Sequence, residues 1–249
     1  MGETAAPKPT GTALVVSQDT AAIEQLIVPL QQFAISVRIC PDVEEAMSLV
    51  EKRKFEAVVV DLVLGYQAMT LLQMVHDSPS NRTAVTFAIT TSREEATLAL
   101  KRGAHFLLER PLSADSLSHT VRAAYGSILR ERRRYFRYPI TVPVLLRRSG
   151  NPQLPGQMMN ISERGMALKA PVSVAPGSEG TVQFVLPDLA VPITAEAKVC
   201  WSNEQGHAGL QFLSLSAETA SKLSAWLAER LEEQLPKNVT QKFGSPTDL

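Results

Sequence analysis

The sequence predicts two domains: a doubly wound α/β domain with a parallel five-stranded sheet, then an antiparallel six-stranded β-barrel with a C-terminal helix. Three observations lead to this prediction. The chain has 249 residues, enough for two domains of about 100–130 residues each. Its first half alternates short apolar runs with helical patterns. Its second half holds six short strand-like runs and then one amphipathic helix.

Residues 11–128 form the alternating half. The run EAVVV, which ends at Val60, is the kind of continuous β-branched segment that is buried on both faces of a sheet. Helical patterns follow the apolar runs, and Asp42 stands where an N-cap is expected. The predicted strands are ALVV from Ala13, VRIC from Val37, EAVVV, TAVTFAIT from Thr83 and HFLLER from His105.

Polar residues follow these strands, at the edge where doubly wound sheets bind their ligands. They are Ser17 and Gln18 after the first strand, Asp61 after the third, Thr90 after the fourth, and Arg110-Pro111 after the fifth.

This layout resembles the receiver domain of two-component response regulators. The resemblance implies that Asp61 is a candidate phosphoacceptor, that Thr90 is the hydroxyl residue of the fourth strand, and that Arg110 replaces a lysine. Receivers also carry an acidic pair after the first strand that helps to hold Mg²⁺, whereas this chain has Ser17-Gln18, with Asp19 one position late. Since Mg²⁺ needs well-placed oxygen ligands, it is not expected as a cofactor.

Asp61 therefore has two interpretations. It is either a working phosphoacceptor or a relic in a degenerate receiver that serves as a scaffold. The missing acidic pair favours the scaffold.

The second half is predicted to form the barrel over residues 140–235. Its runs ITVPVLLRR, PGQMMN, GMALKAP, GTVQFVLP, ITAEAKVCW and AGLQFLSL are separated by Gly, Pro, Ser and Asn. A helix capped by Ser216 follows, and its apolar face is expected to cover an open edge or mouth of the barrel. Residues 236–249 are predicted to be a flexible tail. The residues of that apolar face are Ala220, Leu223, Trp226, Leu227 and Leu231.

A basic segment at residues 129–139 is predicted to link the two domains. Residues 130–137 hold five arginines and one glutamate, a local charge of +4 in a chain of zero formal net charge. Within it, Arg133 and Arg137 form an RxxxR pattern, and Asn160 to Gly165 read NISERG in a predicted turn between strands. Both patterns together, in this order, resemble the PilZ domain, a bacterial receptor module for cyclic di-GMP. The resemblance covers residues 131–235.

The resemblance implies that Arg133, Arg137, Asn160, Ser162 and Gly165 bind cyclic di-GMP, and the residue types suit that ligand. Arginine forks clamp phosphates or bridge O6 and N7 of guanine. An Asn carbonyl can accept from guanine N1–H and N2–H₂, a Ser adds a hydroxyl, and Gly permits a tight turn.

The neighbours of these residues have both functional and structural interpretations. Arg132 or Arg134 is expected to add a third cation. Tyr135 and Phe136 are expected either to pack under the ligand or to anchor the linker on the barrel. The basic run alone could be a solvated helix end, and Ser162 and Gly165 could simply form a hairpin turn. Trp201 and Trp226 are assigned to the core.

Other functional classes find no support in the sequence. No nucleophile–base pair, phosphate-binding loop or metal-ligand spacing is present, so an enzyme is not expected. The cysteines Cys40 and Cys200, the start of the chain and the lack of a long apolar run predict a cytoplasmic protein without membrane insertion. Overall neutrality makes nucleic acid an unlikely partner. A homodimer through the helix from Asp115 and an unidentified downstream protein partner stay open.

We therefore predict a cyclic di-GMP-binding signalling protein in which the ligand orders the arginine linker and reorients the two domains. The resemblance implies control of motility, surface polysaccharide or biofilm. One alternative is a PilZ-type interaction adaptor that no longer binds the nucleotide. A second is a phosphorylation-driven response regulator whose linker contacts DNA.

Overall fold

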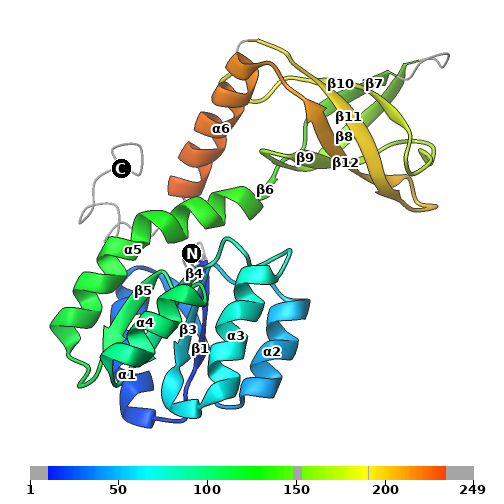
Figure 1. Cartoon of the computed structure of the whole chain (residues 1–249). Coiled ribbons are helices and arrows are strands. Elements are labelled where there is room, and N and C mark those ends of the chain that lie inside the picture. Colours follow the sequence, from blue (N-terminus) through cyan, green and yellow to red (C-terminus); the bar gives the residue numbers. More distant parts are fainter. Residues whose placement is uncertain (1–10, 148–152, 190, 234–249) are drawn as a thin grey trace, which may run out of the picture. The chain divides into compact units, whose positions relative to one another are not determined.

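The computed structural model describes residues 11–147, 153–189 and 191–233, and the predicted tail at 236–249 lies outside the described residues. The chain divides into two compact units, with the boundary between Arg132 and Arg133. Figure 1 labels the helices and strands of both units.

The described residues of the first unit form a parallel five-stranded sheet of order β2-β1-β3-β4-β5. This is the doubly wound order in which the chain changes direction beside β1, so the predicted fold class is confirmed. Every residue of the central strands β3 and β4 is buried, as the run of β-branched residues predicts. The strands are β1 (Gly11–Val16), β2 (Ile35–Cys40), β3 (Ala57–Asp61), β4 (Val85–Thr90) and β5 (Phe106–Glu109).

Helices cover both faces of this sheet (Figure 1). Helices α1 and α5 supply Leu26 and Val121 to the core cluster on one face, while α2 and α3 supply Val50 and Leu72 to the other. The predicted cap is present, since Asp42 accepts a hydrogen bond from the backbone N–H of Glu45 at 2.7 Å. The helices are α1 (Thr20–Gln32), α2 (Val43–Lys52), the short 3₁₀ helix η1 (Leu62–Leu64), α3 (Tyr66–Asp77), α4 (Arg93–Lys101) and α5 (Ala114–Tyr135).

The second unit is an antiparallel barrel. Six strands in the order β8-β7-β10-β11-β12-β9 close through pairing of β8 with β9, and the two-residue β6 adds to β8. Among the described residues the predicted six-stranded barrel is therefore confirmed. The strands are β6 (Tyr138–Pro139), β7 (Pro143–Arg147), β8 (Leu154–Ser162), β9 (Gly165–Lys169), β10 (Glu179–Phe184), β11 (Ile193–Ser202) and β12 (His207–Ser214).

The C-terminal helix α6 (Ala217–Glu232) completes the barrel core. It begins at the predicted cap, Ser216, whose hydroxyl accepts from the backbone N–H of Thr219 at 3.1 Å. The predicted apolar face is buried except for Ala220, which is exposed. Trp226 is 4% exposed, its indole N–H donates to the carbonyl of Pro187 at 2.8 Å, and Tyr138 packs edge-on against its ring.

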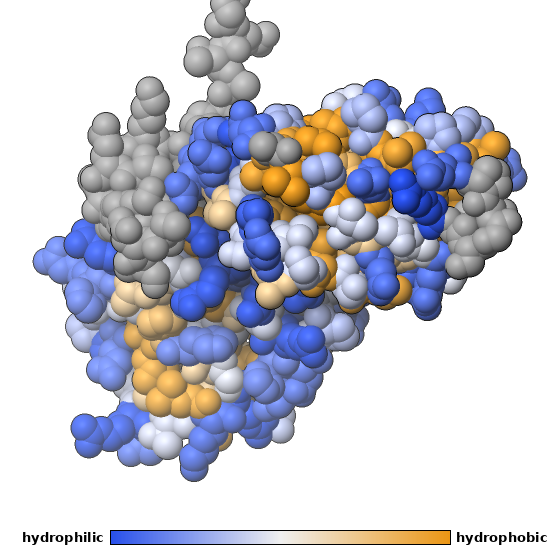
Figure 2. All heavy atoms as spheres, turned by 90° about the horizontal axis from the view of Figure 1, so that it is seen from above, coloured by the Kyte–Doolittle hydropathy of each residue, from blue (hydrophilic) through white to orange (hydrophobic). Residues whose placement is uncertain are grey.

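None of the described helices combines the length and apolar character that crossing a bilayer requires. Figure 2 shows a mostly hydrophilic face on which apolar residues gather in separate patches.

Candidate functional site

The turn between β8 and β9 places Ser162 and Gly165 opposite each other. The Ser162 hydroxyl is buried and donates to the carbonyl of Gly165 at 3.0 Å. A Cβ atom at Gly165 would lie 2.0 Å from the carbonyl oxygen of Leu210 on β12, so only glycine fits there. Both residues have a clear structural role in closing the hairpin.

Arg137 and Asn160 come from the two sequence motifs and are in contact. Strand β6 directly follows Arg137 and pairs with β8, with Pro139 opposite Asn160. This register lets Nη1 of Arg137 donate to Oδ1 of Asn160 at 3.0 Å. Neither side chain is buried. The fold thus brings together two of the predicted ligand residues that are 23 positions apart in sequence.

Arg133 lies in the last turn of α5, so the first part of the predicted linker is helical, as far as Tyr135. Its Nη2 lies 3.9 Å from Oε1 of Glu232, with side chains 26% and 22% exposed. Its Nε is buried and has no hydrogen-bond partner among the described residues. Phe136 is 5% exposed and belongs to the barrel core, which supports its interpretation as an anchor.

Arg132, the other partly buried arginine of this segment, is directed to the first unit. Its Nη1 lies 3.6 Å from Oε1 of the buried Glu56. The preceding residue, Glu131, is buried and binds both Lys54 and the hydroxyl of Thr83. These contacts hold this end of α5 on the first unit. Arg134, the remaining candidate, is exposed.

Trp201 is not a core residue, and its assignment to the core is wrong. Its side chain is 51% exposed. Strand β11 alternates buried and exposed residues up to Val199, which would bury position 201, but a β-bulge between Val199 and Trp201 turns the indole outward. Trp226 is in the core, as predicted. Sequence alternation alone cannot reveal a bulge, so the exposed indole was missed.

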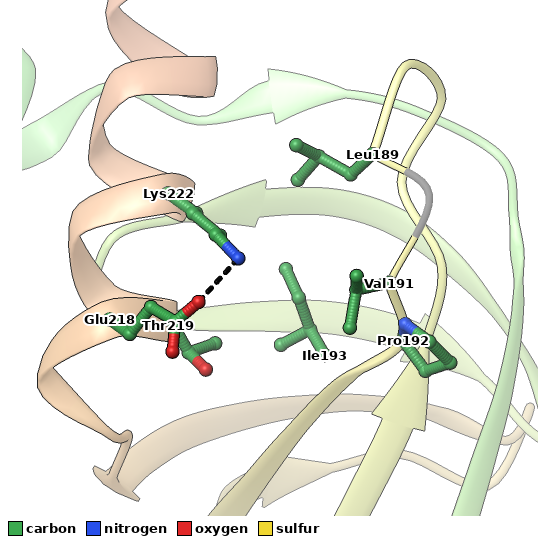
Figure 3. Close-up of a pocket in the computed structure, with 7 residues that line it drawn as sticks. All are labelled: Leu189, Val191, Pro192, Ile193, Glu218, Thr219 and Lys222. Atoms are coloured by element: carbon green, nitrogen blue, oxygen red, sulfur yellow. Dashed lines mark hydrogen bonds and ion pairs between the residues drawn. The ribbon is translucent and has the colours of Figure 1, made fainter.

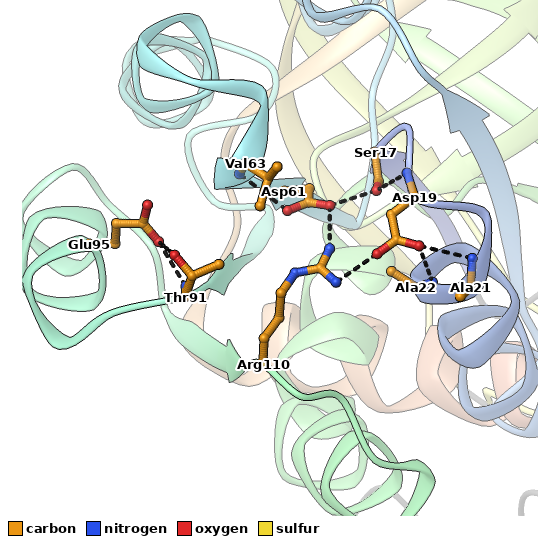
Figure 4. Close-up of polar contacts among 9 residues, drawn as sticks. All are labelled: Ser17, Asp19, Ala21, Ala22, Asp61, Val63, Thr91, Glu95 and Arg110. Carbon is orange, nitrogen blue, oxygen red and sulfur yellow. Dashed lines mark hydrogen bonds and ion pairs between the residues drawn. The ribbon is translucent and has the colours of Figure 1, made fainter.

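The first unit gathers its polar residues at the carboxyl edge of the sheet, as Figure 4 shows. Oδ2 of the buried Asp61 accepts from the Ser17 hydroxyl at 2.7 Å and from Nη2 of Arg110 at 2.8 Å. Nη1 of the same guanidinium donates to Oδ2 of Asp19 at 2.6 Å. Asp19 also caps α1 by accepting from the backbone N–H groups of Ala21 and Ala22. One arginine therefore bridges two carboxylates from different strand ends.

The charges of this cluster stabilise one another. The hydrogen bond from Arg110 and those from the helix α1 backbone lower the pKa of Asp19 below its ordinary value. Burial opposes the charged form of Arg110, but the hydrogen bonds and charges of Asp19 and Asp61 outweigh it and raise the pKa of Arg110. Thr90 is also buried at this edge, and its hydroxyl has no hydrogen-bond partner among the described residues.

The Arg110 guanidinium lies between the two carboxylates of this cluster. Mg²⁺ needs several oxygen ligands, and Arg110 already holds the oxygens that Asp19 and Asp61 direct to one place. Within the described ranges there is no group of three or more His, Cys, Asp or Glu side chains that could hold a metal. The guanidinium instead supplies the positive charge that a metal would bring.

A separate pocket of about 260 Å³ opens beside α6 in the second unit, as Figure 3 shows. None of the predicted ligand residues lines it. Its charged groups, Glu218 and Lys222, pair with each other at 2.6 Å, and its remaining lining residues are Leu189, Val191, Pro192, Ile193 and Thr219. The pocket therefore presents no unpaired charge to an anionic ligand.

Comparison with known proteins agrees with the two-part architecture. Residues 131–229 match the family model described as "PilZ domain". Comparison with curated proteins gave no match.

Solved structures resemble the first half of the chain. A protein of Chloroflexus aurantiacus J-10-fl is 24% identical, with a TM-score of 0.44, and the match covers 48% of this chain and 99% of that one. A response regulator from Thermotoga maritima is 18% identical, with a TM-score of 0.42, and the match covers 49% of this chain and 98% of that one. A response regulator receiver domain protein (CheY-like) from Methanospirillum hungatei JF-1 is 20% identical, with a TM-score of 0.43, and the match covers 48% of this chain and 97% of that one.

The sheet order of the first unit is that of receiver domains. The barrel of the second unit coincides with the family match. Residues 131–229 therefore match the PilZ domain family, and they follow a domain whose parallel sheet has the receiver order β2-β1-β3-β4-β5.

Proposed function

We propose that this chain is a cyclic di-GMP-binding signalling protein whose ligand is held by Arg133, Arg137 and Asn160. A PilZ domain suggests cyclic di-GMP signalling and a receiver domain suggests two-component signalling, and both are typically regulatory modules rather than enzymes. Which residues bind the ligand, and how binding acts on the rest of the chain, are our proposal.

The observation that best supports the proposal is the contact between Arg137 and Asn160. An arginine and an amide, from separate motifs, meet on the surface of the barrel at 3.0 Å. Together they offer guanidinium donors for a phosphate or for guanine O6 and N7, and a carbonyl acceptor for guanine N1–H. A phosphate and a guanine of one ligand need this combination.

Breaking the ion pair between Arg133 and Glu232, which would free Arg133 for the ligand, costs little free energy. The separation of Arg133 from Glu232 is 3.9 Å and both side chains are about a quarter exposed. An ion pair at 3.9 Å whose two members both remain partly accessible to water contributes roughly 1 kcal/mol or less. A charge-assisted hydrogen bond to a phosphate contributes about 1.5–3 kcal/mol, so the ligand outcompetes Glu232.

The end of helix α5, at the boundary between the two units, is the segment that would couple ligand binding to domain orientation. Helix α5 is continuous from Ala114 to Tyr135, with Glu131 and Arg132 bound to the first unit and Arg133 bound within the second. We propose that a ligand that fixes Arg133 and Arg137 against the barrel orders this junction and reorients the two domains.

Isothermal titration of the full-length protein with cyclic di-GMP tests the proposal. We expect Arg137→Ala and Arg133→Ala each to weaken binding by roughly 10- to 150-fold, the value of one charge-assisted hydrogen bond. Arg147→Ala is the matched control, since Arg147 is an exposed arginine on β7 of the same barrel and should leave binding unchanged. Wild-type protein that binds no cyclic di-GMP would refute the proposal and favour an interaction adaptor.

The phosphorylation-driven alternative is disfavoured by the Arg110 bridge. Asp61 is buried and its Oδ2 is held by both Ser17 and Arg110. Incubation with acetyl phosphate and Mg²⁺ followed by mass spectrometry should leave Asp61 unmodified. A phosphorylated Asp61 would restore the alternative.

A further inference from the structure

The exposed indole of Trp201 lies flat on the outer wall of the barrel. A Cβ atom at Gly209 would lie 2.0 Å from Nε1 of Trp201 and 2.4 Å from Cε2, so one face of the ring covers this glycine. The side chain is nevertheless 51% exposed, which leaves the other face open to solvent. An indole with one supported face and one open face is a stacking surface for a planar ring.

Strand pairing connects this indole to the Arg137–Asn160 contact. Trp201 pairs with Gly209, Gly209 with Ala167, and Ala167 with Asn160. Three strand spacings of about 4.8 Å give a row roughly 14 Å long. The side chains between its two ends are only a hydrogen and a methyl group, so nothing bulky on the row separates Trp201 from Asn160.

Both ends of the row are turned outward by β-bulges. One bulge lies between Val199 and Trp201, and another lies between Met158 and Asn160. Without them, regular alternation would direct Asn160 inward with Met158, and Trp201 inward with Val199, since both of these residues are in the barrel core. Bulges are features that redirect side chains near functional sites.

We propose that Trp201 binds one base of cyclic di-GMP by stacking, while Arg137 and Asn160 bind the phosphate and the other base. This inference rests on the proposed function and extends it to a residue outside both sequence motifs. Cyclic di-GMP carries two guanines on one cyclic diphosphate, so a ligand anchored at one end of the row has a second purine to place. The open indole face is the aromatic surface that the row offers to it.

Tryptophan fluorescence tests the stacking directly. The chain has two tryptophans, and Trp226→Phe removes the buried one, which leaves Trp201 as the only indole. Titration of this variant with cyclic di-GMP should quench the Trp201 emission and protect it from acrylamide. Binding that is seen by calorimetry while the emission stays unchanged would overturn the inference.

Calorimetry on single variants completes the test. Trp201→Ala should weaken binding by roughly 5- to 150-fold, the range for one base–aromatic stack, while Trp201→Phe should retain most of the affinity. Leu145→Ala is the control, since Leu145 is an exposed apolar residue on β7 of the same barrel. Thermal melting of each variant verifies that the barrel is folded.

The outcomes separate this inference from the proposed function. Wild-type protein that fails to bind cyclic di-GMP refutes the proposed function itself. Wild-type protein that binds, together with a folded Trp201→Ala variant of equal affinity, refutes only the role of Trp201.

Discussion

Replacing Arg110 by methionine is expected to destabilise the receiver-like domain by about 2–3 kcal/mol. The change keeps an apolar stem but removes the charge beside Asp61, whose side chain is 2% exposed. Removal of one partner from a buried ion pair typically costs about 3–5 kcal/mol, because the other charge remains buried. Since Arg110 is 24% exposed, we place the cost at or below the lower end of that range.

The two domains can be followed separately in urea. Both tryptophans lie in the barrel domain, whereas helices α1 to α4 and most of α5 belong to the first unit. The far-ultraviolet circular dichroism transition of Arg110→Met should therefore move to lower urea, by about 0.7–3 M for a slope of about 1–3 kcal/mol per M. The tryptophan fluorescence transition should stay in place.

A double-mutant cycle with Asp61→Asn tests the cause. If the cost comes from the uncompensated carboxylate, Arg110→Met should cost about 2 kcal/mol less in the Asp61→Asn background. An equal cost in both backgrounds would refute the reasoning. Millimolar Mg²⁺ should also raise the stability of Arg110→Met but not of the wild type, because the variant frees the oxygens of Asp19 and Asp61.

Three further predictions concern single residues. Gly165→Ala should lower barrel stability by about 1–3 kcal/mol or more, because the added methyl group meets a backbone carbonyl that cannot move aside; fluorescence-monitored urea unfolding measures this. Gly126→Ala, in α5 with open space around its Cβ, should instead stabilise the first unit by about 0.5–1 kcal/mol in the dichroism transition. Burial, and then the charge of His76, lowers the pKa of His105, so the neutral ring is favoured in the folded state. The contribution of the neutral His105 ring to the free energy of unfolding is complete above about pH 6.5 and is lost as the pH falls through the lowered pKa. The free energy of unfolding should therefore be smaller at about pH 5 than above about pH 6.5, and His105→Gln should reduce this difference.

The sequence predicted the architecture because hydrophobic periodicity is local. The apolar run that ends at Val60 predicts a buried strand. Asp61, which follows this run and is the last residue of β3, was predicted to lie at the functional edge of the sheet. The bridge from Arg110 to Asp19 was not predicted, because it joins side chains that are 91 positions apart. In sequence Asp19 is only an acidic residue one position late, whereas in the structure it both caps α1 and binds Arg110.

The barrel site shows the same division between local and distant information. The motifs around Arg137 and Asn160 were recognisable in sequence, yet their 3.0 Å contact depends on pairing between β6 and β8. Trp201 was assigned wrongly because one extra residue in β11 reverses the direction of every side chain that follows it. Ser162 and Gly165 occupy the predicted turn, where packing already accounts for them.

The Arg110 bridge makes the counter-ion of Asp61 a covalent part of the polypeptide. A soluble ion can be chelated, diluted or exchanged, but a tethered guanidinium stays at a fixed effective concentration for as long as the fold persists. The Asp61 carboxylate thus has a positive partner whose presence does not depend on the concentration of a free ion.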